Sequence, residues 1–63
     1  MPVVQITILE GRTLEKKEAM IAAVTEAIHT TIDSPRENVR VILYEVPKTN
    51  FAVGGKTMAQ LGR

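Results

Sequence analysis

The first residues of the chain alternate between two faces in the way that a β-strand does. Residues 3–9 (VVQITIL) are rich in β-branched side chains, which favour extended backbone. Val4, Ile6 and Ile8 fall on one face of the predicted strand, and the other face consists of Val3, Gln5, Thr7 and Leu9. Because both faces carry apolar groups, we expect both to be covered. Residues 10–12 (EGR) then break the pattern as a turn.

A second strand is predicted over residues 39–46 (VRVILYEV). Val39, Val41 and Leu43 share one face, and the other face consists of Arg40, Ile42, Tyr44 and Val46. An arginine on a mostly apolar strand face is unusual, because a buried guanidinium needs a partner or a ligand to neutralise it.

Between these strands the apolar period changes to that of a helix running from Leu14 to about Ile32. Thr13 is a plausible N-cap, and Glu15 stands in the first turn, where the helix dipole favours an acid. The predicted apolar stripe consists of Met20, Ile21, Val24, Ala27, Ile28 and Ile32. The polar side consists of Lys16, Lys17, Glu18, Glu26 and His29, and we expect the two lysines and the histidine to be solvated.

Two shorter elements are also predicted, a helical turn and a hairpin. Residues 33–35 (DSP) end the helix, and residues 34–37 (SPRE) match a capping box with proline at the first helical position, which predicts a single short turn. Residues 51–56 (FAVGGK) are typical of a short hairpin with a glycine turn. We expect this tail to extend onto a neighbouring subunit.

These elements predict an α/β fold: a β-α-β unit with two parallel strands, one long helix and a short C-terminal hairpin, in a single domain spanning residues 1–63. The helix covers one sheet face, and the other face has no cover within the chain. A chain of 63 residues has a marginal core of its own, and no cysteine is present to form a disulfide. Self-association is therefore the expected source of stability.

Charge and composition argue against several classes of function. The net charge is +1 with acids and bases interspersed, whereas a nucleic-acid binder would show a basic stripe. No apolar run reaches membrane-spanning length, and the first residues lack the basic leader of a signal peptide, so we expect a cytoplasmic protein with no membrane partner. With no cysteine and one histidine the chain cannot build a thiolate or histidine metal site, although carboxylates could still hold a hard cation. No glycine-rich phosphate loop follows a strand.

The remaining candidate groups are a proline and two arginines. Removal of Met1 would leave Pro2 as a free secondary amine, and an apolar pocket beside cations would lower the pKa of such an amine until it serves as a general base. Arg12 and Arg40 carry planar guanidinium groups that bind carboxylates bidentately. Composition alone leaves open that Pro2 simply starts a strand and that both arginines are structural ion-pair partners.

Four parts of the chain match a known family: the segments MPVVQITILEGRT, SPRENVRVILYEV and KTNFAVGGK, and the helix between the first two. Along essentially its whole length the chain resembles the 4-oxalocrotonate tautomerase (2-hydroxymuconate tautomerase) family. The order and spacing of the segments agree without insertions. The resemblance implies an isomerase of aromatic-hydrocarbon catabolism that needs no cofactor and acts on small unsaturated 2-oxo or 2-hydroxy (di)carboxylates. It also implies β-α-β units that pair into dimers, with three dimers forming a homohexamer.

Carried over by position, the resemblance places the catalytic groups on Pro2, Arg12, Arg40 and Phe51. Pro2 would shuttle the proton, and Arg12 would bind the distal carboxylate of the substrate. Arg40 would reach in from a neighbouring subunit to polarise the 2-oxo or 2-hydroxy group. Phe51 would close the pocket and keep it apolar, and the substrate-binding wall would consist of Leu9 and Val53.

Two alternatives remain open from the sequence. Related enzymes hydrate or dehalogenate unsaturated acids with the help of a carboxylate that activates water, but Ala52 and Val53 offer no acid beside Phe51. A non-enzymatic assembly module would also explain the apolar faces, and in that case Pro2 and the arginines would not converge. Gly62 departs from the resemblance, because some relatives carry a basic residue at this position.

Overall fold

Two parallel strands form the centre of the chain. The computed structural model describes all of residues 1–63, with β1 at Val3–Leu9 and β2 at Arg40–Val46. The strands pair in register along their whole length, from Val3 opposite Arg40 to Leu9 opposite Val46. The predicted bounds of the first strand are confirmed. The second strand starts one residue later than expected, because the N–H of Val39 donates to Arg36 O in the preceding turn at 3.1 Å.

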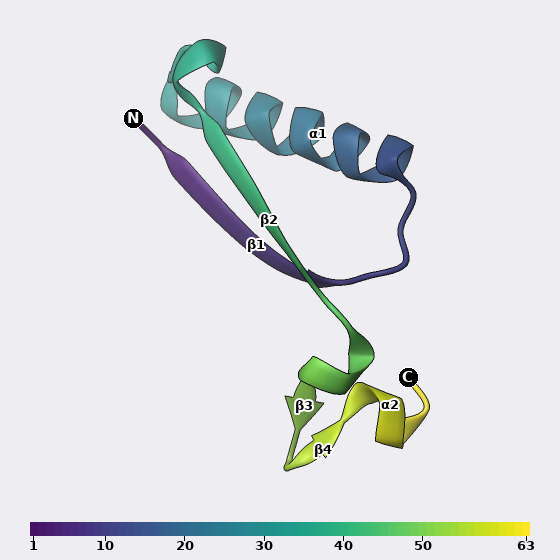
Figure 1. The fold of residues 1–63 in the computed structure, drawn as a ribbon. Coiled ribbons are helices and arrows are strands. Elements are labelled where there is room, and N and C mark those ends of the chain that lie inside the picture. Colours follow the sequence, from purple (N-terminus) through teal and green to yellow (C-terminus); the bar gives the residue numbers. More distant parts are fainter.

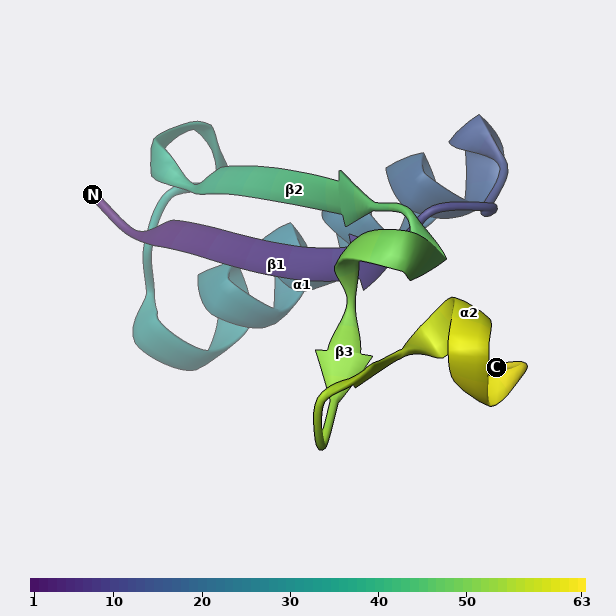
Figure 2. The same ribbon diagram turned by 60° about the horizontal axis from the view of Figure 1, so that its bottom comes forward.

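The helix α1 (Leu14–Ile32) lies across one face of this sheet (Figure 2). It begins and ends as predicted: the Thr13 hydroxyl accepts a hydrogen bond from Lys16 N at 3.3 Å, and Asp33 ends it in the left-handed region. The residues beneath the helix are half-buried, namely Val4, Ile6, Ile8, Val41 and Leu43. No helix in the chain is both long enough and apolar enough to cross a membrane.

The predicted apolar stripe of α1 is only partly correct. Met20, Val24 and Ile28 are half-buried against the sheet, but Ala27 is exposed and Ile32 is 62% exposed. The exposure of Ile32 follows from length: a 19-residue helix spans about 28 Å at roughly 1.5 Å per residue, whereas a seven-residue strand spans about 23 Å at roughly 3.3 Å per residue. The end turns of α1 therefore project beyond the sheet, and Leu14 in the first turn is also exposed.

The opposite face of the sheet has no cover within the chain, as the sequence predicts. Val3, Ile42 and Tyr44 are exposed on this open face. The one buried residue is Met58, at 7% exposure, and it lies outside the β-α-β unit. A single chain therefore has no closed core around its sheet.

A single 3-10 turn, η1 (Arg36–Asn38), connects α1 to β2. The predicted turn is confirmed, but the predicted capping box is wrong. Pro35 stands at the N-cap with extended backbone, and no side chain caps the turn. The Ser34 hydroxyl instead donates to Pro35 O at 3.5 Å.

The C-terminal arm (residues 47–63) projects away from the β-α-β unit (Figure 1). It contains η2 (Lys48–Asn50), β3 (Ala52–Val53), β4 (Lys56–Thr57) and α2 (Met58–Leu61). The predicted hairpin is confirmed, and Gly54 and Gly55 turn it with φ of 62° and 85°, which suits a two-glycine turn. The helix α2 was not expected from the sequence.

Candidate active site

Pro2 and Arg40 lie together at the start of the two strands. The backbone N–H of Arg40 donates to Pro2 O at 3.0 Å. Pro2 is half-buried and continues the row of helix-facing residues that starts with Val4, whereas Arg40 belongs to the open face with Ile42. Pro2 and Arg40 of one chain therefore share an edge of the sheet but belong to different faces of it.

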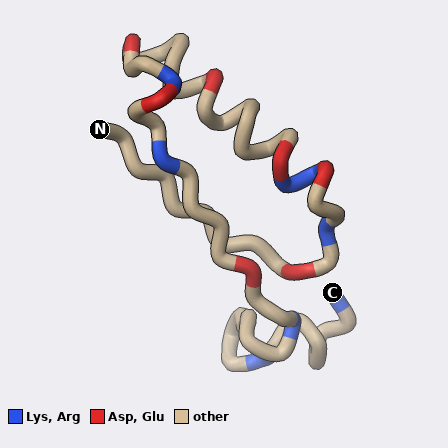
Figure 3. Tube along the Cα trace, turned by 45° about the horizontal axis from the view of Figure 1, so that its top comes forward, with Lys and Arg blue, Asp and Glu red and all other residues tan.

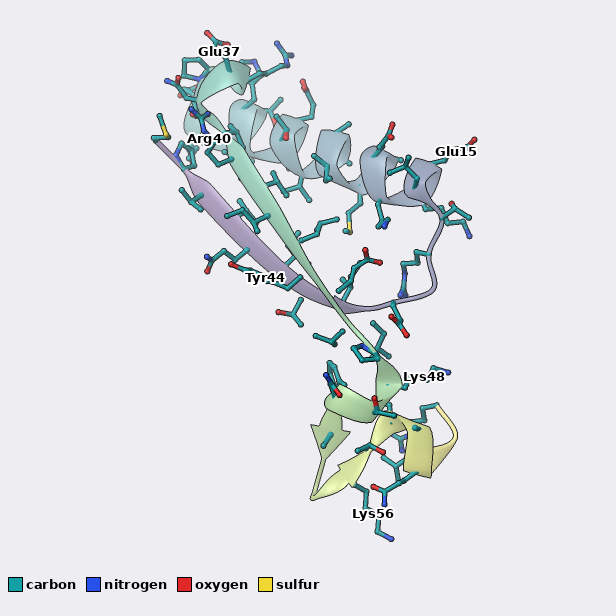
Figure 4. The ribbon with its side chains drawn as sticks, in the orientation of Figure 1. Glu15, Glu37, Arg40, Tyr44, Lys48 and Lys56 are labelled. Atoms are coloured by element: carbon teal, nitrogen blue, oxygen red, sulfur yellow. The ribbon has the colours of Figure 1, made fainter.

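The Arg40 side chain has most of its donors unused. Its Nη1 donates to Glu37 O at 2.8 Å, and the guanidinium forms no ion pair. Figure 4 shows Arg40 and Glu37 at the same end of the molecule, beside the N-terminal end of β1. An exposed guanidinium oriented by one backbone carbonyl retains several N–H donors for an anion.

The turn that leads into Arg40 is fixed to α1 by side chains. Arg36 binds Glu26 bidentately, with Nε–Oε2 and Nη2–Oε1 both at 2.8 Å. The hydrogen bond from Arg36 lowers the pKa of Glu26. His29, which we expected to be solvated, is half-buried, and its Nδ1 lies 2.7 Å from Ser34 O. That ring nitrogen therefore carries a proton and donates to the carbonyl.

Arg12 lies at the other end of β1, in the loop between the strand and α1. Its Nη1 donates to Leu9 O at 3.2 Å, and like Arg40 it forms no ion pair. Leu9 is half-buried at the end of the strand. Arg12 therefore lies beside Leu9, three residues earlier in the chain, and their roles in binding a substrate stay predictions.

Within one chain the candidate residues form two separate groups. Pro2 and Arg40 lie at one end of β1, and Arg12 lies at the other end, about 23 Å away at roughly 3.3 Å per residue. A small dicarboxylate cannot span that distance. The single chain also encloses no pocket.

The C-terminal arm presents the last two candidates on its surface. Phe51 is exposed, and its carbonyl accepts a hydrogen bond from Met58 N at 2.7 Å, while Val53 is also exposed in β3. The arm follows β2, so it begins at the Leu9 end of the sheet (Figure 1). Its Lys and Arg side chains are accompanied by no Asp or Glu, as Figure 3 shows for the segment that leads to the C-terminus.

The structure differs from the sequence prediction at one lysine of α1. Lys17, expected to be solvated, forms an ion pair with Glu45 of β2, with Nζ–Oε1 at 2.8 Å. The side chains are 23% and 34% exposed, respectively. The spacing of α1 alone could not reveal this contact, because it depends on how the helix lies across the sheet.

Two further findings concern alternative chemistry. The structure contains no group of three or more His, Cys, Asp or Glu side chains placed to hold a metal ion. No carboxylate is buried, so the single chain gives no specific support to a hydratase that uses a buried acid to activate water.

With Met1 attached, the nitrogen of Pro2 is an amide and has no basic lone pair. Met1 is 78% exposed, so no packing hides the peptide bond that joins it to Pro2. A base at this position therefore requires that Met1 be removed.

Comparison with known proteins gives consistent matches over the chain. The sequence profile of the family described as "Tautomerase enzyme" matches residues 2–60. The chain is 49% identical to a 2-hydroxymuconate tautomerase from Stutzerimonas stutzeri over 63 residues, which is 100% of both chains.

Solved structures agree with the sequence matches. A 4-oxalocrotonate tautomerase isozyme from Methylibium petroleiphilum superposes with a TM-score of 0.94 at 39% identity, covering 97% of this chain and 95% of the other. A heterohexamer 4-oxalocrotonate tautomerase from Chloroflexus aurantiacus J-10-fl gives a TM-score of 0.91 at 43% identity, covering 97% and 98%.

Proposed function

Because the chain belongs to the tautomerase family and is an isomerase, we propose that it converts a 2-hydroxymuconate-like dienol to the conjugated 2-oxo acid, with Pro2 as the general base. The observation that carries this proposal is that the two candidate arginines form no ion pair within the chain. Arg12 and Arg40 are the positions expected to bind the substrate, and neither is paired with a carboxylate of the chain. Arg36, which has no proposed role in the reaction, is paired.

The proposed proton transfer needs no redox step. The Pro2 amine, freed by loss of Met1, takes the hydroxyl proton of the dienol and returns a proton to a carbon further along the conjugated chain. Negative charge spreads over the conjugated system between these two events. A fixed guanidinium near the 2-oxygen stabilises that charge, and we assign this role to Arg40. Arg12 binds the distal carboxylate bidentately and sets the direction of the chain.

Assembly is part of the proposal, because one chain separates the two groups of residues. We propose that copies of the chain associate through the open sheet face as a homohexamer, a trimer of dimers, so that Arg40 of one subunit reaches a site that contains Pro2 of another. The exposed apolar side chains of Val3, Ile42 and Tyr44 support this, since contiguous exposed apolar surface is typical of interaction sites. Phe51, Leu9 and Val53 would then line the pocket, with the enzyme acting in the cytoplasm.

The proposal is tested by following ketonisation of 2-hydroxymuconate by absorbance, with an unsaturated haloacid as the comparison substrate. Rapid ketonisation with little hydration of the haloacid is the expected result. Absence of ketonisation by correctly processed protein would contradict the proposed substrate. It would leave the membership of the family intact.

A further inference from the structure

We propose that Lys17 and Glu45 form a positioning pair for Arg12, which holds the loop of residues 10–13 so that Arg12 meets the distal carboxylate of the substrate. This inference rests on the proposed function, in which Arg12 binds that carboxylate.

The loop is tied to the end of β2 on both of its sides. On the strand side, Glu10 N donates to Val46 O at 2.9 Å. On the helix side, Lys17 Nζ donates to Glu45 Oε1 at 2.8 Å. The two anchors, Glu45 and Val46, are consecutive residues of β2, so both ends of the loop are attached at the same point of the sheet.

Lys17 is connected directly to the last residue of the loop. Its backbone N–H donates to Thr13 O at 3.1 Å, and the Thr13 hydroxyl accepts from Lys16 N at 3.3 Å. Moving Lys17 therefore moves the N-cap of α1 and the residues just before it. Arg12 lies between the two ties, and its side chain is oriented only by one hydrogen bond to Leu9 O at 3.2 Å.

Other contacts do not replace this tie. Gly11 has φ of 120° and no atom near the position of a side chain, so the middle of the loop is open. Leu14, at the start of α1, is 66% exposed and does not anchor the helix by packing. Apart from the hydrogen bonds of Glu10 N to Val46 O and of Arg12 Nη1 to Leu9 O, the Lys17–Glu45 ion pair is the polar contact that joins this corner to the sheet.

The ion pair also determines which cation the Glu45 carboxylate binds. Glu45 lies one residue before the anchor of the loop, at the same end of the sheet as Arg12. With Lys17 present, the carboxylate is neutralised and Arg12 remains unpaired. Loss of Lys17 would leave an uncompensated anion near the loop, competing with the substrate for Arg12.

The test compares Lys17→Met with Lys16→Met, which removes the same charge from the neighbouring position. The Lys16 side chain is exposed and forms no ion pair. Steady-state constants are measured with 2-hydroxymuconate and with the corresponding mono-acid dienol, which lacks the distal carboxylate. We expect Lys17→Met to raise KM for the diacid about 2- to 5-fold, the range that a partly exposed ion pair supports, with kcat and the mono-acid constants unchanged. Lys16→Met should match the wild type.

A charge reversal provides the rescue. The double variant Lys17→Glu with Glu45→Lys restores an ion pair between the same positions, and KM for the diacid should return to the wild-type value within experimental error. Equal losses on both substrates, or equal effects of Lys17→Met and Lys16→Met, would overturn the positioning role.

Hydrogen exchange separates this proposal from the proposed function. Protection of the hydrogen-bonded amides on either side of Arg12, those of Glu10, Lys16 and Lys17, should fall in Lys17→Met and stay at the wild-type level in Lys16→Met. If wild-type protein turns over neither dienol, the proposed substrate is wrong, and exchange alone shows whether the pair fixes the loop. Unchanged protection in Lys17→Met would overturn the pair as the anchor of the loop.

Discussion

The backbone N–H of Arg40 donates to the carbonyl of Pro2 at 3.0 Å, which joins the proposed base of one site to a residue proposed to serve another. Pro2 and Arg40 belong to different faces of the sheet. Because a hydrogen bond joins them, a shift of either strand moves both residues. Under the proposed function, this hydrogen bond links the residue that transfers the proton to a residue that stabilises charge in a neighbouring site. Because the contact uses the backbone of Arg40, we expect it to survive a change of the Arg40 side chain.

Arg40→Ala should lower kcat by about 10²- to 10³-fold, the loss typical of removing one preorganised donor to developing negative charge. The backbone hydrogen bond to Pro2 and the η1 turn remain in the variant, so the assembly should elute as wild type in size-exclusion chromatography. Steady-state kinetics of ketonisation measures the effect. Normal turnover would contradict the role assigned to Arg40.

Pro2→Ala should reduce kcat/KM strongly and leave the melting temperature nearly unchanged. Alanine leaves a primary amine in place of the rigid secondary one, and we expect a loss of about 10²-fold, the lower end of what a positioned base contributes. The melting temperature should change little, because Pro2 is only half-buried. A variant as active as wild type would rule out Pro2 as the base.

Arg12→Ala should act on binding of the diacid. Loss of a charge-assisted contact with the distal carboxylate is expected to raise KM for 2-hydroxymuconate about 10- to 100-fold, with a much smaller effect on the mono-acid dienol. The ratio of the two kcat/KM values is the measurement. An equal loss on both substrates would mean that Arg12 does not bind the distal carboxylate.

The Glu26–Arg36 pair should stabilise the fold in a pH-dependent way. The pKa of Glu26 is lowered from its ordinary value of 4.5 by the hydrogen bond from Arg36. Its contribution is therefore present above that ordinary value and is lost as the pH falls through the lower folded-state pKa. The melting temperature of Arg36→Gln should lie slightly below wild type at pH 7.

At a pH where the Glu26 carboxyl is protonated, the two melting curves should coincide. Both side chains of the pair are exposed, so the difference should also shrink in high salt. Lys16→Gln, which removes a cation that forms no ion pair, serves as the control. A difference that persists at acid pH would show that Arg36 acts through packing instead.

Most of the fold follows from local patterns in the sequence. The helical spacing of apolar residues in α1 and the cap at Thr13 are both visible in a short stretch of sequence. The bounds of the helix are therefore predicted correctly. The short elements are harder, because residues 34–37 match a capping box in sequence while Pro35 adopts extended backbone. The four-residue helix α2 is too short for a periodic signal, although Thr57 and Gln60 form a capping box that indicates its start.

The candidate site is only partly accessible from the sequence. Exclusion of other chemistry leaves Pro2, Arg12 and Arg40 as candidates, and the family resemblance gives them roles. Neither shows whether an arginine is paired with a carboxylate. That depends on three-dimensional neighbours, as the partner of Lys17 illustrates: Glu45 is remote in sequence and is reached only because α1 crosses the end of β2. The same limit explains why the half-buried position of His29 was not foreseen.

The central claim is that the free amine of Pro2 is the working base, and one measurement tests it most directly. Ketonisation of 2-hydroxymuconate is compared for two preparations whose N-termini are verified by mass spectrometry, one with Met1 removed and one with Met1 retained. We predict rapid turnover by the processed protein and none above background by the form with Met1, in which the Pro2 nitrogen is an amide. Equal turnover by the two forms would contradict the claim.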